Sequence, residues 1–266
     1  STFWNHFFEG QYPEIEFIKP GTPVDNLYAM YKVGWFYDGD KINLDHNPVD
    51  PKSRPLQATA SDILGLEYKE VVPKIIKPER PNRYGKKFVC FSPHASASAK
   101  YWHNEQGWQA IINYIKNVLG YEVVMISKEK YNDTWETSKL PGNKMFEGII
   151  DATGDFPIEE RMADLLNCEF FIGVGSGLSW LAWALGKKVI MISGFSDTWA
   201  EFETDCTRII NKNVCNSCFN NFKLDAGDWN WCPAHKDTPR QFECTKQITP
   251  KMVMDTIDQL LIEQKI

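Results

Sequence analysis

Short apolar runs alternate with segments of helical periodicity over the C-terminal two thirds of the chain. The runs have the length of buried strands, and the segments between them repeat apolar residues at helical spacing. Strands that alternate with helices in this way are typical of a doubly wound parallel sheet. The expected strands are 87–91, 121–126, 146–150, 170–174 and 189–192, and the expected helices are 107–119, 157–167 and 176–185.

The clearest unit of this pattern is the stretch 168–195, CEFFIGVGSGLSWLAWALGKKVIMISGF. The run 170–174 predicts a buried parallel strand, because it is apolar throughout and meets Gly173 and Gly175 at its end. A helix is expected from Ser176 to Leu185, since Leu178 and Leu181 repeat at helical spacing and Gly186 can end it. With the run 189–192 this makes a strand–helix–strand unit.

The turn before that helix has the chemistry of an anion site. The start of a helix exposes N–H groups that lack partners, and it carries a partial positive charge. Gly173 and Gly175 lack the side chains that would keep an anion away, and Ser176 and Ser179 add hydroxyl groups. The diphosphate of a nucleotide fits such a site. The alternative is that the glycines only make a tight turn and Ser176 only caps the helix.

The first 82 residues show no comparable regularity. We expect a strand at 14–18, a strand or short helix at 27–37, and a helix at 56–64 that ends at Gly65. A stretch rich in proline, 72–82, predicts a linker. The expected division is therefore an N-terminal region, 1–82, and a larger domain, 83–266.

Ligands of parallel sheets bind beyond the carboxyl ends of the strands. Four loops follow expected strands: 92–100, 151–154, 173–179 and 193–201. Lys100 is a candidate phosphate ligand, and Asp151 and Glu201 are candidate acceptors for sugar hydroxyls. The alternatives are a solvated surface lysine and carboxylates that cap a turn or lie on the surface.

Four of the seven cysteines lie close together near the C-terminus. Cys215 and Cys218 form a CxxC knuckle, and Cys232 and Cys244 complete a tetrahedral set for iron or zinc. We call residues 205–245 the cysteine segment. The segment has few apolar residues to fix itself, so a structural ion would explain how it folds. The alternatives are reduced thiols without a metal, or His235 as a substitute ligand.

Composition excludes several classes of protein. The net charge of −6 argues against nucleic acid as a general partner. The chain has no apolar run long enough to cross a membrane and no signal peptide at its start. The cysteine pattern suits a reducing compartment, so we expect a cytoplasmic protein.

Several stretches together give the chain a family resemblance. It resembles the bacterial autotransporter heptosyltransferases, relatives of the lipopolysaccharide heptosyltransferases of glycosyltransferase family 9. The matching text covers most of the chain: YPEIEFI at 12–18, ASDILGL at 60–66, KYW at 100–102, FIGVGSGLSWLAWALGKKVIMISGF at 171–195, CNSC at 215–218 and WCPAHKDTPRQFECT at 231–245.

The resemblance implies an α/β fold of the GT-B type and an enzyme that moves heptose from ADP-heptose to serine hydroxyls of an adhesin of the autotransporter kind. It implies that Lys100 contacts the donor phosphates and that Asp151 and Glu201 lie near the nucleotide or the sugar. It also implies an iron ion held by Cys215, Cys218, Cys232 and Cys244. The diphosphate would lie in the turn that contains Gly175, Ser176, Gly177, Leu178 and Ser179.

Members of this family have a longer N-terminal domain, in which an aspartate serves as the catalytic base. That segment would precede residue 1, so the N-terminal, acceptor-side region of this chain is shortened. Asp38, Asp40 and Asp45 are candidate substitutes. A partner chain, or a second copy in a homo-oligomer, is an alternative source of the base. Two other functions stay open: a nucleotide-sugar-binding or scaffold subunit without catalysis, and a transferase for another sugar or acceptor.

Overall fold

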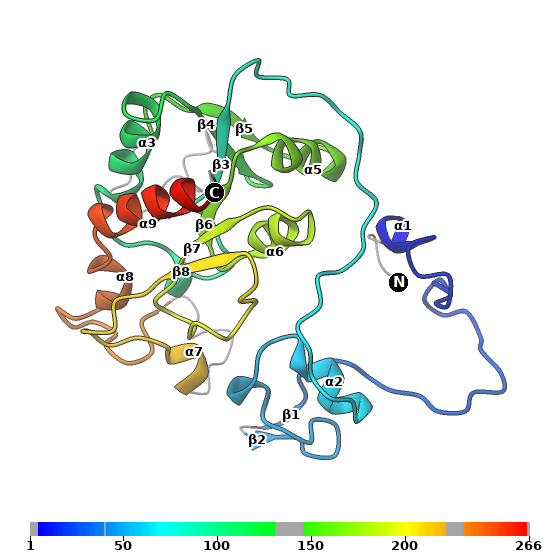
Figure 1. Cartoon of the computed structure of the whole chain (residues 1–266). Coiled ribbons are helices and arrows are strands. Elements are labelled where there is room, and N and C mark those ends of the chain that lie inside the picture. The colour runs from blue at the N-terminus through cyan, green and yellow to red at the C-terminus, as the bar shows by residue number, and fades with distance from the viewer. Residues whose placement is uncertain (1–4, 40, 131–145, 222–230, 265–266) are drawn as a thin grey trace.

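The computed structural model describes residues 5–39, 41–130, 146–221 and 231–264. Its centre is a six-stranded sheet in the order β5-β4-β3-β6-β7-β8, in which every neighbouring pair is parallel (Figure 1). The strands are β3 (Phe88–Ser92), β4 (Glu122–Ser127), β5 (Ile150–Thr153), β6 (Phe171–Val174), β7 (Val189–Ile192) and β8 (Cys206–Ile209). The expected α/β class with a doubly wound parallel sheet is confirmed.

Helices cover both faces of this sheet. The helices α3 (Gly107–Asn117) and α9 (Pro250–Glu263) lie on one face, and α5 (Ile158–Asn167) and α6 (Gly177–Ala184) lie on the other (Figure 1). Side chains alternate between the faces, as the pleat of a strand requires. Ile190 and Ile192 join the core under α3 and α9, whereas Val189 and Met191 join the core under α5 and α6.

Most of the expected elements of this domain are found. Strands β3, β4, β6 and β7 and helices α3, α5 and α6 lie within two residues of their expected bounds. The expected strand at 146–150 is wrong, because β5 begins at Ile150 and runs to Thr153. The residues Asp151 and Thr153 therefore belong to an edge strand and not to a turn after it. The sequence also predicts a loop at 132–143, between two of these strands, and those residues lie outside the described ones.

The N-terminal region has little regular structure. It contains α1 (Asn5–Phe8), the short hairpin β1 (Tyr37–Asp38) and β2 (Lys41–Ile42), and α2 (Ala58–Leu64). The expected strand at 14–18 is wrong, and 27–36 forms neither strand nor helix. Several apolar side chains there are exposed, among them Tyr28 and Met30, so this stretch has no core of its own. The expected helix at 56–64 is confirmed, and Gly65 ends it in the left-handed conformation.

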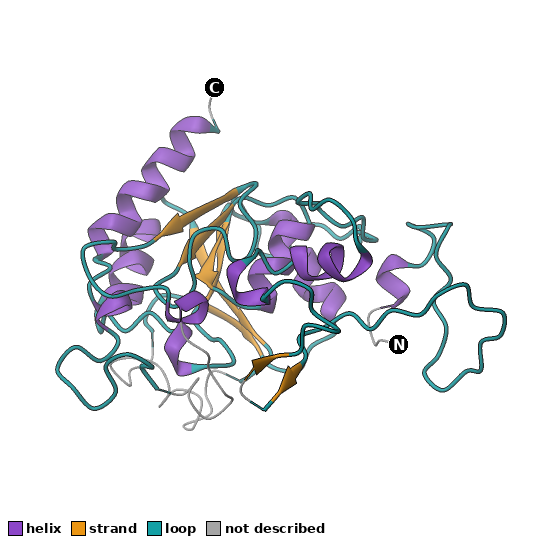
Figure 2. Ribbon diagram, turned by 90° about the horizontal axis from the view of Figure 1, so that it is seen from below, coloured by secondary structure: helices purple, strands orange, loops and turns teal. Residues whose placement is uncertain are grey.

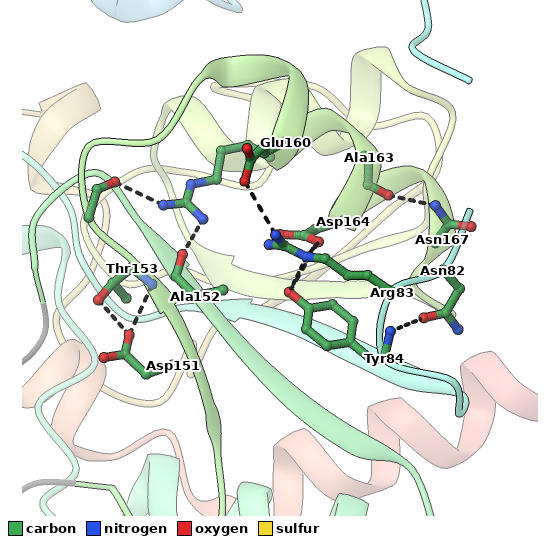
Figure 3. A network of polar contacts seen from close by, with 12 residues as sticks. Asn82, Arg83, Tyr84, Asp151, Ala152, Thr153, Glu160, Ala163, Asp164 and Asn167 are labelled. Carbon is green, nitrogen blue, oxygen red and sulfur yellow. Dashed lines mark hydrogen bonds and ion pairs between the residues drawn. The ribbon is translucent and has the colours of Figure 1, made fainter. Parts of the chain in front are cut away.

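The chain between the two regions is fixed to helix α5. Arg83 donates two hydrogen bonds to the buried carboxylate of Asp164, and the Tyr84 hydroxyl donates a third (Figure 3). Between α2 and Arg83 the chain passes outside the central sheet and its helices (Figure 1). Figure 2 shows the strands of the sheet lying between the helices of its two faces. A division at residue 82 stays a prediction. None of the described helices combines the length and apolar character needed to span a lipid bilayer.

Candidate functional site

The strand order reverses between β3 and β6. The chain moves outward from β3 through β4 to β5, then returns to the other side of β3 and continues outward from β6. A reversal of this kind opens a crevice beyond the carboxyl ends of the two central strands, where ligands of α/β proteins bind. Ser92 and Gly173 pair across this point, so the loop after Ser92 and the turn after Val174 lie on either side of the crevice.

The N-terminus of α6 points its free amides to this edge of the sheet. Ser176 is the N-cap residue in an extended conformation, but its side chain makes no capping hydrogen bond. The described residues offer no acceptor to the N–H groups of Gly177 and Leu178. The hydroxyls of Ser176 and Ser92 are buried and also lack hydrogen-bond partners among the described residues. Buried polar groups are nearly always paired, so these atoms indicate a place for a ligand.

The two glycines of the turn, Gly175 and Gly177, lie in different surroundings. A Cβ atom on Gly175 would lie 2.9 Å from Oε1 of Glu201, so the carboxylate occupies the place of a side chain there. A Cβ atom on Gly177 would meet nothing within 4 Å. The exposed face of the turn is therefore open at Gly177, beside the free amides.

Lys100 lies on the other side of the crevice, at the end of the 3-10 turn η2 (Ser98–Lys100). The structure records no hydrogen bond or ion pair of its ammonium group with the described residues. Burial lowers the pKa of Lys100, and the negative charge of Glu201 partly offsets that effect. A half-buried lysine whose ammonium has no partner among the described residues favours the binding of an anion.

Glu201 already has partners inside the protein. Its Oε2 lies 2.7 Å from Nη1 of Arg208, and both side chains are almost fully buried. The Ser196 hydroxyl donates to the same carboxylate at 3.0 and 3.2 Å. This arrangement suits a residue that supports the Gly175 turn from below. A direct contact between Glu201 and a sugar or nucleotide stays a prediction.

The structure places two other expected ligands away from the free amides. The Ser179 hydroxyl is fully buried and donates to the carbonyl of Val174 at 2.6 Å, and the Ser179 N–H donates to the carbonyl of Ser176. Asp151 lies on β5, three strands from β6, and accepts hydrogen bonds from the N–H and hydroxyl of Thr153 (Figure 3). With strands about 4.8 Å apart, β5 lies about 14 Å from β6.

Sequence patterns missed one carboxylate near the crevice. Glu129 lies two residues after the last residue of β4, at the carboxyl end of the strand beside β3. It accepts a hydrogen bond from Ser127 at 2.8 Å, and burial is outweighed by this bond and nearby positive charge, which together lower its pKa. The sequence signal for Glu129 was its position close to the end of an expected strand. Its charged neighbours Lys128 and Lys130 made the stretch look like an ordinary surface loop.

The four cysteines of the expected metal site are free thiols that lie near one another. Cys218 and Cys232 belong to one buried cluster, against which Cys215 packs. Burial, with neighbouring thiols adding to it, raises the pKa of Cys218 and of Cys244 to about 12. Thiols in such surroundings stay protonated until a metal ion displaces the protons, which is the chemistry of a cysteine metal site.

Among the described residues, Cys215, His235 and Glu243 form a group whose ligand atoms all lie within 4.8 Å of one another, whereas the four cysteine thiols do not form such a group. Glu243 is held by two hydrogen bonds from Arg240. The geometry thus keeps His235 as an alternative ligand and adds a carboxylate that sequence patterns did not indicate.

Two of the expected catalytic aspartates, Asp38 and Asp45, lie on or beside the β1–β2 hairpin. Asp38 is exposed and accepts a hydrogen bond from Asn43 at 2.8 Å. Asp45 follows the hairpin, and its N–H donates to the Asn43 side chain. Asp40 lies outside the described residues. A role for any of them as a base stays a prediction.

Known proteins similar to this chain are glycosyltransferases. The autotransporter heptosyltransferase BAHTCr of Citrobacter rodentium is 39% identical over 254 residues, which cover 94% of this chain and 59% of the relative. The inactive autotransporter heptosyltransferase BimC of Burkholderia thailandensis is 31% identical and is covered to 57%. This chain thus spans about three fifths of the length of the curated relatives it matches.

The crystal structure of TibC, an iron-containing dodecameric glycosyltransferase from Escherichia coli H10407, matches 97% of this chain with a TM-score of 0.84 and 36% identity. The match covers 66% of the TibC chain. TibC has also been solved in complex with ADP-D-beta-D-heptose, and that structure matches with a TM-score of 0.83.

A family model matches the middle part of the chain. The model of glycosyltransferase family 9 (heptosyltransferase) matches residues 52–223, which include the crevice, Lys100, the Ser176 turn and the first two cysteines of the metal set. The resemblance to autotransporter heptosyltransferases is confirmed, and this chain belongs to glycosyltransferase family 9.

Proposed function

We propose that the domain 83–266 binds an ADP-activated heptose and that the protein transfers the sugar to a serine hydroxyl of an autotransporter-like adhesin. The observation that carries the proposal is the crevice between β3 and β6, where the amides of Gly177 and Leu178 have no acceptor among the described residues and the loop after β3 carries Lys100. A doubly charged diphosphate satisfies both groups at once.

The chemistry follows from the charge that develops in the reaction. The serine oxygen bonds to the anomeric carbon while the bond from that carbon to the diphosphate oxygen breaks. The leaving ADP gains negative charge, which the helix amides and Lys100 stabilise without moving. The serine proton passes to a general base on the acceptor side, for which Asp38 and Asp40 are the candidates in this chain. In this scheme Glu129 accepts hydrogen bonds from the ribose hydroxyls.

We propose further that Cys215, Cys218, Cys232 and Cys244 bind a structural iron or zinc ion, with His235 as an alternative ligand. Four protein ligands fill a tetrahedral site, so the ion would stabilise the cysteine segment and would not bind substrate. The iron in TibC supports this proposal. Free thiols suit a reducing compartment, in keeping with action in the cytoplasm. The dodecamer of TibC supports a homo-oligomer for this chain as well.

Titration with ADP tests the donor site. Lys100→Met removes a charge-assisted contact worth roughly 1.5–3 kcal/mol, so ADP affinity falls roughly 10- to 150-fold. Gly177→Ala places a methyl group in open space at the anion site, so the fold is retained and ADP affinity falls. Lys32→Met, at an exposed position of the N-terminal region, is the matched control. Unchanged affinity in both site variants would reject the assignment.

A second candidate function is nucleotide-sugar binding without catalysis. The relative BimC, which is named as inactive, favours keeping it. Incubation with ADP-heptose and a serine-rich acceptor separates the two, because a transferase releases ADP and increases the acceptor mass by one heptose. Binding of ADP without either product supports the binding subunit.

A further inference from the structure

The residues around Lys100 are fixed to the cysteine segment. Ala99, which precedes Lys100, is buried in one apolar cluster with Cys218, Cys232, Phe195 and Phe242. Two of the four expected metal ligands therefore pack in the same cluster as the turn that carries the phosphate-binding lysine.

The residues after Lys100 are attached to the end of the same segment. The His103 ring stacks on Phe242, with centroids 3.9 Å apart and planes 7° from parallel. The His103 N–H and its Nδ1 both contact the Thr245 hydroxyl, at 3.3 and 2.9 Å. Thr245 follows Cys244 directly and is fully buried. Trp102 donates to the carbonyl of Ile248, which continues the attachment beyond the segment.

The cysteine segment also supports the loop after β7. A Cβ atom on Gly194 would lie 2.9 Å from Cβ of Cys244, so the two backbones touch there. Ser217 and Phe219 donate N–H groups to the carbonyls of Gly194 and Phe195. This loop leads to Ser196, which holds the Glu201 carboxylate beneath Gly175.

We propose that Thr245 and Phe242 are positioning residues that hold Lys100 at the donor phosphates, and that metal retention by the cysteines and ADP binding are thermodynamically coupled. The proposal rests on the donor site proposed above. If binding at one site orders groups that the other site uses, each ligand must raise the affinity for the other by the same factor. The ion then acts on the donor site through Ala99 and His103, without touching ADP.

The first test uses ADP titration of variants that keep the cysteines. Thr245→Val keeps the shape of the side chain but removes the hydroxyl that His103 contacts, so ADP affinity falls roughly three- to tenfold. Thr245→Ser keeps the hydroxyl and restores affinity. Thr207→Val, at an exposed position on β8, is the matched control and leaves affinity unchanged. The metal content of each purified variant, measured by mass spectrometry, stays that of the parent.

The second test needs no variant of the segment. Saturating ADP slows the loss of the bound ion to a chelator in the parent protein, whereas it has no effect in Lys100→Met. Removal of the ion lowers ADP affinity severalfold. Equal chelation rates with and without ADP, or ADP affinity that is unchanged in both Thr245→Val and the metal-free protein, would overturn the coupling. Failure of the parent protein to bind ADP at all would instead reject the proposed function.

Discussion

The buried ion pair between Glu201 and Arg208 gives a prediction that the structure makes quantitative. Only 8% of the Glu201 side chain and 4% of the Arg208 side chain are exposed, and their charged atoms lie 2.7 Å apart. Glu201→Gln removes the negative charge and leaves the arginine charged in a buried place. Removing one partner of such a pair costs about 3–5 kcal/mol in the free energy of unfolding.

The expected result is strong non-additivity. Arg208→Met alone leaves the carboxylate of Glu201 buried with only the Ser196 hydroxyl as a described side-chain partner, so it also destabilises. The double variant has no buried charge, and its loss of stability is smaller than the sum of the two single losses by about 2 kcal/mol or more. Urea unfolding of the parent, the two single variants and the double variant measures this coupling energy.

The exposed pair Lys251–Asp255 on α9 is the matched control. Its atoms lie 2.6 Å apart, but 80% and 60% of the side chains are exposed. The same cycle with Lys251→Met and Asp255→Asn should give a coupling energy of only about 0.3–0.5 kcal/mol. If the Glu201 and Arg208 variants were additive within that small range, the inference that burial makes this pair a structural support of the Gly175 turn would be refuted.

Four other predictions concern the crevice and its surroundings. Ser176→Ala removes a buried hydroxyl without a described partner, so ADP affinity falls in calorimetry while the free energy of unfolding in urea is kept. Ser179→Ala removes the hydrogen bond to Val174, so urea unfolding shows a loss of about 1 kcal/mol while ADP affinity is kept. Because burial lowers the pKa of Lys100, ADP affinity falls as the pH is raised through that pKa. ADP titrations over a series of pH values show this decline in the parent protein but not in Lys100→Met, and the same decline in the variant would contradict the assignment of Lys100 to the donor site. Burial lowers the pKa of His103 from 6.5 to about 4, so between these pH values the unfolded chain binds a proton that the folded chain does not. Acidification through this window therefore lowers the free energy of unfolding by on the order of 3 kcal/mol. The decrease is smaller in His103→Gln, and an equal dependence of stability on pH in the two proteins would refute the prediction. Arg83→Met leaves the buried carboxylate of Asp164 with the Tyr84 hydroxyl as its one described hydrogen-bond donor. The free energy of unfolding falls by only about 1–2 kcal/mol, because Arg83 itself is nearly half exposed. An unchanged urea midpoint would show that the contact between Arg83 and α5 adds no stability.

The sequence predicts the central strands well because they are buried on both faces. Runs such as 189–192 are apolar throughout, and glycines or prolines mark where they end. Edge strands do not follow this rule. In β5 the exposed Asp151 lies inside the strand, and β8 reads CTRI with polar residues that face solvent or Glu201, so β5 was misplaced and β8 was not foreseen.

Side-chain direction is the part of the site that sequence patterns could not supply. Ser176 caps α6 and Ser179 lies in its first turn, yet the Ser176 hydroxyl lacks a partner among the described residues and the Ser179 hydroxyl turns inward to Val174. Glu201 was identified as a residue of the site, but only the structure shows Arg208 beside it. In the N-terminal region the apolar residues have no period, and exposed Tyr28 shows that they do not mark a core.

We expect donor binding and catalysis to be separable in this chain, because the proposed function assigns them to different elements. The groups proposed to meet the diphosphate lie in the turns that follow β3 and β6, and buried contacts within the larger domain fix both turns. The candidate base Asp38 lies on a hairpin of two-residue strands in the N-terminal region. Substitution of Asp38 should therefore change turnover without changing ADP affinity, whereas substitution of Lys100 should change both. A variant of Asp38 that lost ADP binding would show that the hairpin forms part of the donor site, and the division of roles between the two regions would be wrong.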